Sequence, residues 1–458
     1  MHKERGQSLV MGSVFLATIV MSFLYLFNVS QQNLNKTELQ NSADATVISA
    51  ANLLARDLNF KAYTNRAMVA NHVAVAQYVG LSSWGNMGEK AGQNLQILTA
   101  ATPAVIATSV IQQALTTLNQ GIQIGAEGAI LLTDLVNIGL SMSQELMNSA
   151  SMVALVETSN NVLNANDKEA YIDVASAVGI GQFILSDWVN FQGRFNRRDD
   201  TGRYQEHFDL ITNSVDPFTK NRSFDWGGLF SVSGFPIKWK TKQAGGTELF
   251  KNGNSAEVWS GMDTLGFHLH KFSCKLTSGC KWRGGETPVG WGASHAGSNK
   301  YTNNYTKNDY YGSSRAKNRR SSNLARQNEA AFNSLYSGLQ NFYDISRPEK
   351  TNNAPMLTIV VSKNKSDIIT SSSLDIGTKN QDSTRLIDIN IEENTNLPND
   401  KITVLSKAKI YYFRDQSLWK RSDSKWEYGN LYNPYWQVTL NETSNSERTA
   451  LSALALGL

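Results

Sequence analysis

A chain of 458 residues is too long for one ordinary hydrophobic core and predicts roughly two to four domains. Its 41% hydrophobic and 18% charged residues exclude a disordered protein, and a net charge of +4 gives no reason to expect a nucleic-acid partner. Its two cysteines exclude a disulfide-framework miniprotein and a cysteine-rich metal protein.

The N-terminal stretch Gly6–Asn35 contains no charged residue, and its centre, Ser8–Phe27, is almost wholly apolar. About 20 helical residues span about 30 Å, the thickness of a bilayer's hydrocarbon core. A cleaved signal peptide, which has a shorter apolar region and a small-residue cleavage site, and a buried core helix are the alternatives. Because Lys3 and Arg5 precede the span, the sequence favours a single-pass inner-membrane protein with a cytoplasmic N-terminus and a periplasmic body.

The helix is expected to continue beyond the membrane, since the first proline is Pro103. Apolar and small residues recur in steps of three and four, as on one helix face. They are Leu39, Ala43, Val47, Ala50, Ala51, Leu54, Leu58 and Ala62. The pattern predicts one rod from about residue 8 to residue 80, with an Ala-rich face that another helix can approach closely.

Three sequence pieces mark the same region: Arg5-Gly6-Gln7, Gln40-Asn41-x-Ala43-Asp44-Ala45 and the run Tyr63–Asn71. With them, roughly residues 4–80 resemble the N-terminal region of TadE/TadG-like proteins, which are associated with the Flp, or tight-adherence, type IV pilus machinery. A weaker similarity lies at Leu431–Gln437.

Two departures from that family matter. Pilins cut by prepilin peptidase usually carry Glu five residues after the scissile Gly, but Met11 stands there if Gly6 is that Gly. The protein is therefore expected to stay anchored. The metal-site pattern D-x-S-x-S of some TadG proteins is also incomplete, because the sequences beginning at Asp344 and Asp415 lack the second Ser.

The resemblance implies a non-enzymatic structural or assembly component that contacts pilins or pilus-assembly proteins through the N-terminal helix and the periplasmic body. Membrane lipid is the other expected partner. The candidate helix-packing and partner residues are Gly6, Gln7, Gly12, Ala43, Asp44, Asn65, Arg66 and Asn71. For Arg66 a solvated surface charge is the alternative interpretation, and Asp44 shares this ambiguity.

Residues 88–190 continue as helix by composition. Gly121–Leu140 is apolar enough to suggest a second span, but Glu127 and Asp134 argue against it, because each charge at a bilayer centre costs about 2.5–3.5 kcal/mol. A helical hairpin or bundle packed on the first rod is the expectation.

From residue 191 to residue 350 the chain is rich in Trp and Gly, and we expect an irregular β region. Between Lys271 and Arg326 basic residues far outnumber acidic ones, which predicts a long basic loop. Its candidate contact residues are Lys300, Lys307, Arg315, Lys317, Arg319 and Arg320. The loop is either simply solvated or a contact for anionic lipid, polysaccharide or an acidic subunit. The tryptophans are either core anchors or sugar-stacking platforms.

After a short helix expected at Ala330–Tyr343, strands dominate the C-terminal part of the chain. They are expected at Met356–Val361, Ile368–Ile376, Ile402–Phe413 and Tyr435–Leu440. The fold class is therefore α+β, with a transmembrane helix, a helical bundle, a Trp/Gly-rich β region and a C-terminal antiparallel sheet. The expected domains are residues 1–35, 36–190, 191–350 and 351–458.

Cys274 and Cys280 are expected to form a small structural disulfide in an oxidising periplasm. The alternative is a zinc site that joins them with His268, His270 and perhaps His295. No motif for a nucleophile, a zinc protease or a phosphate-binding loop occurs, so we expect no enzyme activity, no cofactor and no metal. The alternative function is a membrane-anchored adhesin or an envelope-polysaccharide-binding module.

Overall fold

The computed structural model of the chain groups its residues into two compact units, each built from separated stretches of sequence. Unit 1 comprises Met1–Phe60, Leu146–Gly193 and Ile345–Leu458, and unit 2 comprises Lys61–Glu145 and Arg194–Asp344. The structure describes residues 5–199, 202–232, 235–252, 255–275, 279–297, 314, 316–332, 335–346, 352–369, 401–415, 417, 425, 427–447 and 449. The four-domain division expected from the sequence remains a prediction.

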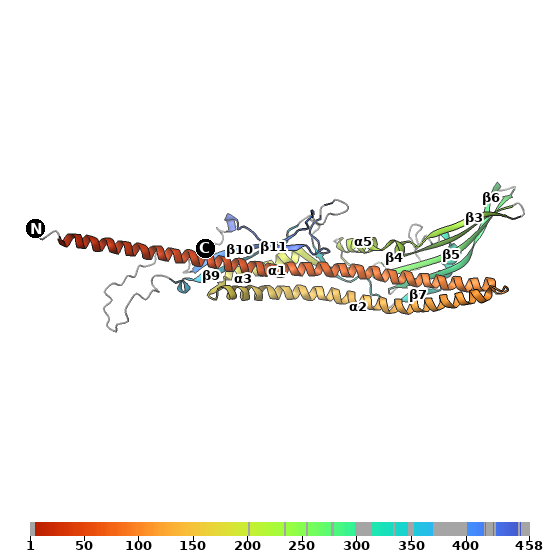
Figure 1. Cartoon of the computed structure of the whole chain (residues 1–458), viewed down its shortest axis with the longest axis horizontal. Helices are drawn as coiled ribbons and strands as arrows, with labels where there is room; N and C mark the ends of the chain where they lie inside the picture. The colour runs from red at the N-terminus through yellow and green to blue at the C-terminus, as the bar shows by residue number, and fades with distance from the viewer. Residues whose placement is uncertain are drawn as a thin grey trace. The chain divides into compact units, whose positions relative to one another are not determined.

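Two long helices, α1 (Arg5–Thr99) and α2 (Val105–Asn166), contribute residues to both units (Figure 1). The long N-terminal apolar helix is confirmed, and it runs past the expected end near residue 80 because no proline precedes Pro103. Both helices are long and apolar enough to cross a membrane by length and composition alone. The most apolar window of α1 is 0% buried, whereas that of α2 is 28% buried.

Unit 1 contains an antiparallel sheet in the order β1-β9-β10-β11. Its smaller elements are β1 (Ala170–Ile172), α3 (Val174–Gln182), the π-helix η1 (Phe183–Trp188), α4 (Val189–Phe191), β9 (Leu357–Asn364), the 3-10 helix η2 (Lys365–Asp367), β10 (Lys401–Tyr412) and β11 (Trp436–Leu440). The C-terminal antiparallel sheet is thus confirmed, and β1 adds a strand from mid-chain that was not predicted. Most of the strand expected at Ile368–Ile376 lies outside the described residues.

The Ala-rich face of α1 packs on this sheet. Along β10 every second side chain from Ile402 onward is buried, and the α1 residues Leu39, Ala43, Val47, Ala50, Leu54 and Leu58 are 0% exposed. Ser406 donates a hydrogen bond to Asp44 at 2.5 Å. The side-chain amide of Asn59 donates to the Trp436 carbonyl at 2.9 Å and accepts from its N–H at 3.0 Å. The small side chains predicted to admit another helix therefore admit the chain's own sheet.

Unit 2 contains a five-stranded sheet in the order β3-β4-β5-β6-β7, antiparallel except for the parallel pair β6–β7. Its strands are β3 (Phe224–Val232), β4 (Phe235–Asn252), β5 (Ser255–Lys275), β6 (Gly279–Ala296) and β7 (Glu329–Phe332). Its helices beside α1 and α2 are α5 (Arg203–Ser214), α6 (Pro217–Lys220) and α8 (Arg319–Gln327). A separate strand pair joins β2 (Gln192–Phe195) to β8 (Phe342–Ile345).

Three expectations for this region are wrong. The Trp/Gly-rich region forms long regular strands rather than irregular β structure. The described part of Lys271–Arg326 consists mainly of a β5–β6 hairpin and helix α8 rather than a loop. The helix expected at Ala330–Tyr343 is replaced by β7 and β8, and the short helix forms earlier, as α8.

The glycines that suggested irregular structure have a packing role, because α1 lies directly on the strands. A Cβ atom on Gly292 would lie 2.1 Å from the Ser83 carbonyl oxygen, and one on Gly290 would lie 2.6 Å from the Met87 carbonyl oxygen. Both distances are far inside van der Waals contact. Glycine at these strand positions therefore lets the backbone of β6 touch the backbone of the helix.

Candidate functional site

The first candidate surface is the apolar beginning of α1. Its large side chains are exposed, for example Leu9 at 76% and Phe15 at 70%. Its hydroxyl groups are satisfied within the helix, since Thr18 Oγ1 donates to the Val14 carbonyl and Ser22 Oγ donates to the Thr18 carbonyl, each at 2.8 Å. A helix whose serine and threonine hydroxyls bond to its own backbone and whose surface is apolar suits a hydrocarbon environment.

The structure separates the predicted helix-packing residues into two groups. Gly12 is exposed, and nothing lies within 4 Å of a Cβ built on it. Gly6 and Gln7 belong to α1, but their side chains lie outside the described residues. Arg66 is exposed on α1.

The other four predicted packing residues bond or pack within their own chain, and the contact of Asn71 with Asn137 is described with the α1–α2 contacts below. Asp44 accepts hydrogen bonds from Ser406 and, at 2.8 Å, from Gln40. The side-chain amide of Asn65 donates to the Tyr343 carbonyl at 2.8 Å. Ala43 is fully buried. The structure thus gives these residues an internal role in orienting α1.

In unit 2, polar side chains link α1 to α2 at regular intervals. Asn71 donates to Asn137 at 2.9 Å, and Ser82 donates to Gln123 at 2.6 Å. Further links along the same helix pair involve Thr64 and Asn65 with Gln144, and Asn86 and Glu89 with Asn119. Residue numbers rise on α1 as they fall on α2, so the helices are antiparallel, as expected for a helical hairpin.

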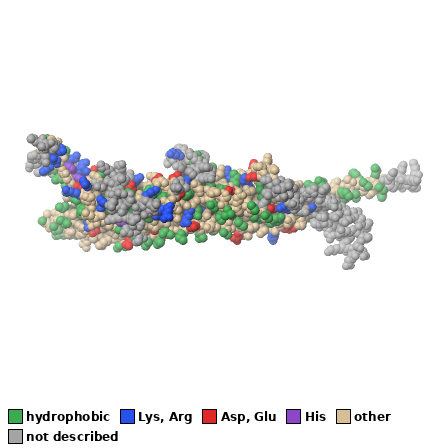
Figure 2. All heavy atoms as spheres, turned by 180° about the vertical axis from the view of Figure 1, so that it is seen from behind, with side chains coloured by type: hydrophobic (Ala, Val, Ile, Leu, Met, Phe, Trp, Pro, Cys, Tyr) green, Lys and Arg blue, Asp and Glu red, His purple; other side chains and the backbone are tan. Residues whose placement is uncertain are grey.

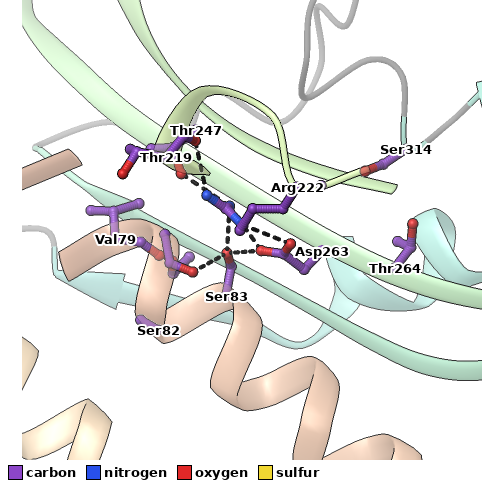
Figure 3. Close-up of polar contacts among 12 residues, drawn as sticks. Val79, Ser82, Ser83, Thr219, Arg222, Thr247, Asp263, Thr264 and Ser314 are labelled. Atoms are coloured by element: carbon purple, nitrogen blue, oxygen red, sulfur yellow. Dashed lines mark hydrogen bonds and ion pairs between the residues drawn. The ribbon is translucent and has the colours of Figure 1, made fainter. Parts of the chain in front are cut away.

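A buried ion pair joins α1, α6 and the sheet of unit 2 (Figure 3). Arg222, just after α6, donates from Nε to Asp263 Oδ1 and from Nη2 to Asp263 Oδ2, each at 2.9 Å. The side chains of Arg222 and Asp263 are only 2% and 0% exposed. Ser83 of α1 donates to Asp263 Oδ2 at 2.5 Å, and Arg222 Nη2 donates to Thr247 Oγ1 of β4 at 3.1 Å.

This cluster is fully occupied by its own chain. Arg222 Nη1 donates to the carbonyls of Thr219 and Phe218 at 2.8 and 3.3 Å, so each of the three guanidinium nitrogens is bonded to a chain acceptor. A Cβ on Gly80 would lie 2.9 Å from Arg222 Nη1, and one on Gly245 would lie 1.9 Å from Asp263 Oδ1. The absence of side chains at these two glycines leaves space for the ion pair. The cluster connects the helix to the sheet and leaves no reactive group available to a ligand.

Two histidines of unit 2 are held neutral. Burial lowers the pKa of His72 to about 3, with His207 adding to the effect, and burial likewise lowers the pKa of His207 to about 3. The Tyr336 hydroxyl lies 3.0 Å from His72 Nδ1. Because the folded-state pKa values lie below the ordinary value of 6.5, the stability that depends on them is present above pH 6.5 and is lost as the pH falls toward 3. These side chains are packing groups at neutral pH.

The disulfide hypothesis is confirmed. Cys274 and Cys280 lie opposite each other on β5 and β6 and are joined by an S–S bond of 2.00 Å. His268 Nε2 lies 2.8 Å from Asn318 Oδ1, and His295 Nδ1 lies 2.9 Å from Glu329 Oε1. In the part of the chain that the structure describes, no group of three His, Cys, Asp or Glu residues is placed to hold a metal ion. The zinc alternative loses its cysteine ligands to the disulfide.

Three of the six predicted basic contact residues, Lys317, Arg319 and Arg320, fall among the described residues. Lys300, Lys307 and Arg315 lie outside the described residues. Lys317 Nζ is 3.5 Å from Asp225 Oδ1. Arg319 and Arg320 open α8, where the Arg320 N–H donates to Glu286 Oε2 at 2.7 Å. Glu286 also accepts from the Ser321 N–H at 2.8 Å, so its carboxylate bonds the first turn of α8, where the helix dipole favours a negative charge.

Comparison with known families concerns the N-terminal helix. Residues 6–53 match the Tad family. That family is described as Flp pilus-assembly TadE/G-like. The match confirms the resemblance inferred from the sequence over these residues, while the likeness up to residue 80 and at Leu431–Gln437 stays a prediction. No curated protein and no solved structure matched the chain.

The Tad segment, residues 6–53, contains both kinds of α1 surface. Its first half is exposed and apolar, and its second half, from Leu39, is buried against the sheet of unit 1. Sequence reasoning found this segment through its apolar run and its helical periodicity. It missed the Arg222–Asp263 pair, because nothing in the spacing of two ordinary charged residues identifies them as partners.

Proposed function

We propose that this protein is a structural or assembly component of a Flp/Tad-like type IV pilus or a related secretion system. The observation that carries the proposal is the Tad segment, which joins an unburied apolar helix to a helix face packed on the chain's own sheet. In this proposal α1 anchors the protein in the inner membrane, with the N-terminus in the cytoplasm and the folded body in the periplasm. The protein acts through protein–protein contacts and without catalysis.

The proposed partner contact lies in the apolar half of the Tad segment. Small residues let transmembrane helices approach closely, since association in lipid depends on van der Waals packing. Gly12 is open on α1, and Gly6 and Gln7 precede it by about two helical turns or less. A pilin or an assembly protein with its own apolar helix fits this surface, and the periplasmic body supplies the remaining contacts.

Deletion and complementation of the gene test the proposal. We expect deletion to lower pilus number and surface adhesion, and the wild-type gene to restore both. Gly12→Leu fills the open helix surface and should restore them only partly. Val10→Leu is the matched control, because it is an apolar exchange at an exposed position two residues away, on roughly the opposite side of the helix. Unchanged pilus number and adhesion after deletion would overturn the assembly role. Full restoration by Gly12→Leu would show that Gly12 does not take part in the partner contact.

A further inference from the structure

The far end of the five-stranded sheet exposes large apolar side chains. Figure 1 shows β3–β6 curving away from α1 and α2 within unit 2. On these strands Trp226 and Leu229 are each 66% exposed. Phe224, Leu269, Phe272 and Trp282 are exposed as well. A local gathering of exposed aromatic side chains marks an interaction site on a folded protein.

Three of these side chains, Trp226, Leu229 and Trp282, border a groove. The groove has a volume of about 480 Å³ and lies between Asp225–Leu229 of β3, Lys238–Lys240 of β4 and Trp282 of β6. We call it the β3–β4 groove. The rings of Trp226 and Trp239 are 5.0 Å apart and perpendicular, so they form an aromatic corner. Sites for small ligands and for single units of a polymer have this size and this lining.

The charge around the groove is positive. Lys238 and Lys240 line it, and in the described part of the chain neither forms an ion pair with a carboxylate. The one acidic lining residue, Asp225, lies 3.5 Å from Lys317. Figure 2 shows Lys and Arg side chains gathered beside histidine at this end of the sheet.

The same positive charges act on His270, which lies on the neighbouring strand β5. Its pKa is lowered first by burial, and then by His268 and by Lys242, Lys238 and Lys240. Neighbouring cations thus disfavour a further positive charge at this position. An anionic group beside the lysines would relieve the repulsion.

We propose that the β3–β4 groove binds an anionic polysaccharide, with sugar rings against the tryptophans and acidic groups at Lys238 and Lys240. A tryptophan face offers apolar contact area to the C–H face of a sugar ring, and lysine supplies a point charge for a carboxylate or phosphate. A concave site fits a chain of sugar units. This goes beyond pilus assembly and gives the polysaccharide-binding alternative a location.

Calorimetric titration of the full-length protein in detergent micelles with short galacturonate oligomers tests the proposal. We expect saturable binding that weakens as salt rises, because the lysine contribution is screened. Trp226→Ala and the double change Lys238→Gln with Lys240→Gln should each weaken binding by about tenfold or more. The matched controls are Tyr63→Ala, which removes an aromatic side chain 63% exposed on α1, and Lys168→Gln, which removes an exposed charge.

Five outcomes would overturn the proposal. No binding of the oligomers would do so, as would equal binding of neutral maltooligosaccharides or of polyglutamate that is insensitive to Trp226→Ala. Binding to phosphatidylglycerol vesicles without binding to galacturonate would assign the groove to a membrane surface instead. An equal loss of binding in the folded control variants would show that binding does not depend on the groove, and circular dichroism of every variant establishes that it is folded.

Discussion

Arg222 and Asp263 show how much a single buried pair can depend on its surroundings. Removing one partner of a buried, hydrogen-bonded ion pair leaves the other charge without compensation in a dry site. Here the carboxylate would keep only Ser83 as a side-chain donor, while Gly80 and Gly245 leave space for the two charged side chains. The cluster therefore stabilises the fold only while both partners of the ion pair are present.

We predict that Arg222→Met lowers the free energy of unfolding by about 3–5 kcal/mol, the usual cost of breaking a buried pair. Arg194→Met is the control, because Arg194 pairs with Glu145 at 2.5 Å where the side chains are 30% and 55% exposed. That exposed pair should contribute about 1 kcal/mol or less. Chemical unfolding of both variants in detergent micelles measures the difference, and equal losses would contradict the structural role of the cluster.

At the scale of elements, the glycines of β6 set the contact between strand and helix. We predict that Gly292→Ala destabilises unit 2 by about 1–3 kcal/mol, because the new methyl group would lie 2.1 Å from the Ser83 carbonyl oxygen and the helix must shift. Gly285→Ala on the same strand is the matched control, since nothing lies within 4 Å of its Cβ position. Thermal unfolding followed by circular dichroism compares them. A Gly292 variant as stable as the Gly285 variant would show that β6 does not touch α1 there.

Helices and strands could be predicted from the sequence where a single local pattern was sufficient. The apolar run and the spacing of Leu39, Ala43 and Val47 predicted α1, and alternation along residues 402–412 predicted β10. The Trp/Gly-rich strands were misjudged, because glycine weakens a strand locally and only the contact with α1 explains it. The pairing of Arg222 with Asp263 could not be inferred from the sequence, because the two residues are 41 positions apart. The importance of the pair also depends on its burial, which the sequence does not show.

At the scale of the whole molecule, the direction of the chain across a membrane depends on whether α2 also spans it. The antiparallel polar contacts between α1 and α2 occupy one side of α2, and Glu127 and Asp134 lie in its apolar stretch. We therefore predict one crossing, by α1. Alkaline phosphatase, which is active only outside the cytoplasm, should be active when fused after Ala101 and when fused at the C-terminus.

The two fusions distinguish one membrane crossing from two. A second crossing by α2 would leave the fusion after Ala101 active and inactivate the C-terminal one. Deleting residues 8–27 is the control and should inactivate both, because the remaining chain would lack its first span. Activity that survives this deletion would contradict anchoring by the start of α1.

The pairing of Asp44 with Ser406 also has a consequence for the order in which the protein is made. The two residues are 362 positions apart, so the helix face around Asp44 emerges from the ribosome long before the strand that covers it. Contacts this distant in sequence form late and slowly. We expect the newly made chain to expose its Ala-rich helix face until β10 and β11 have been synthesised. During this period it should need a chaperone or a partner subunit most.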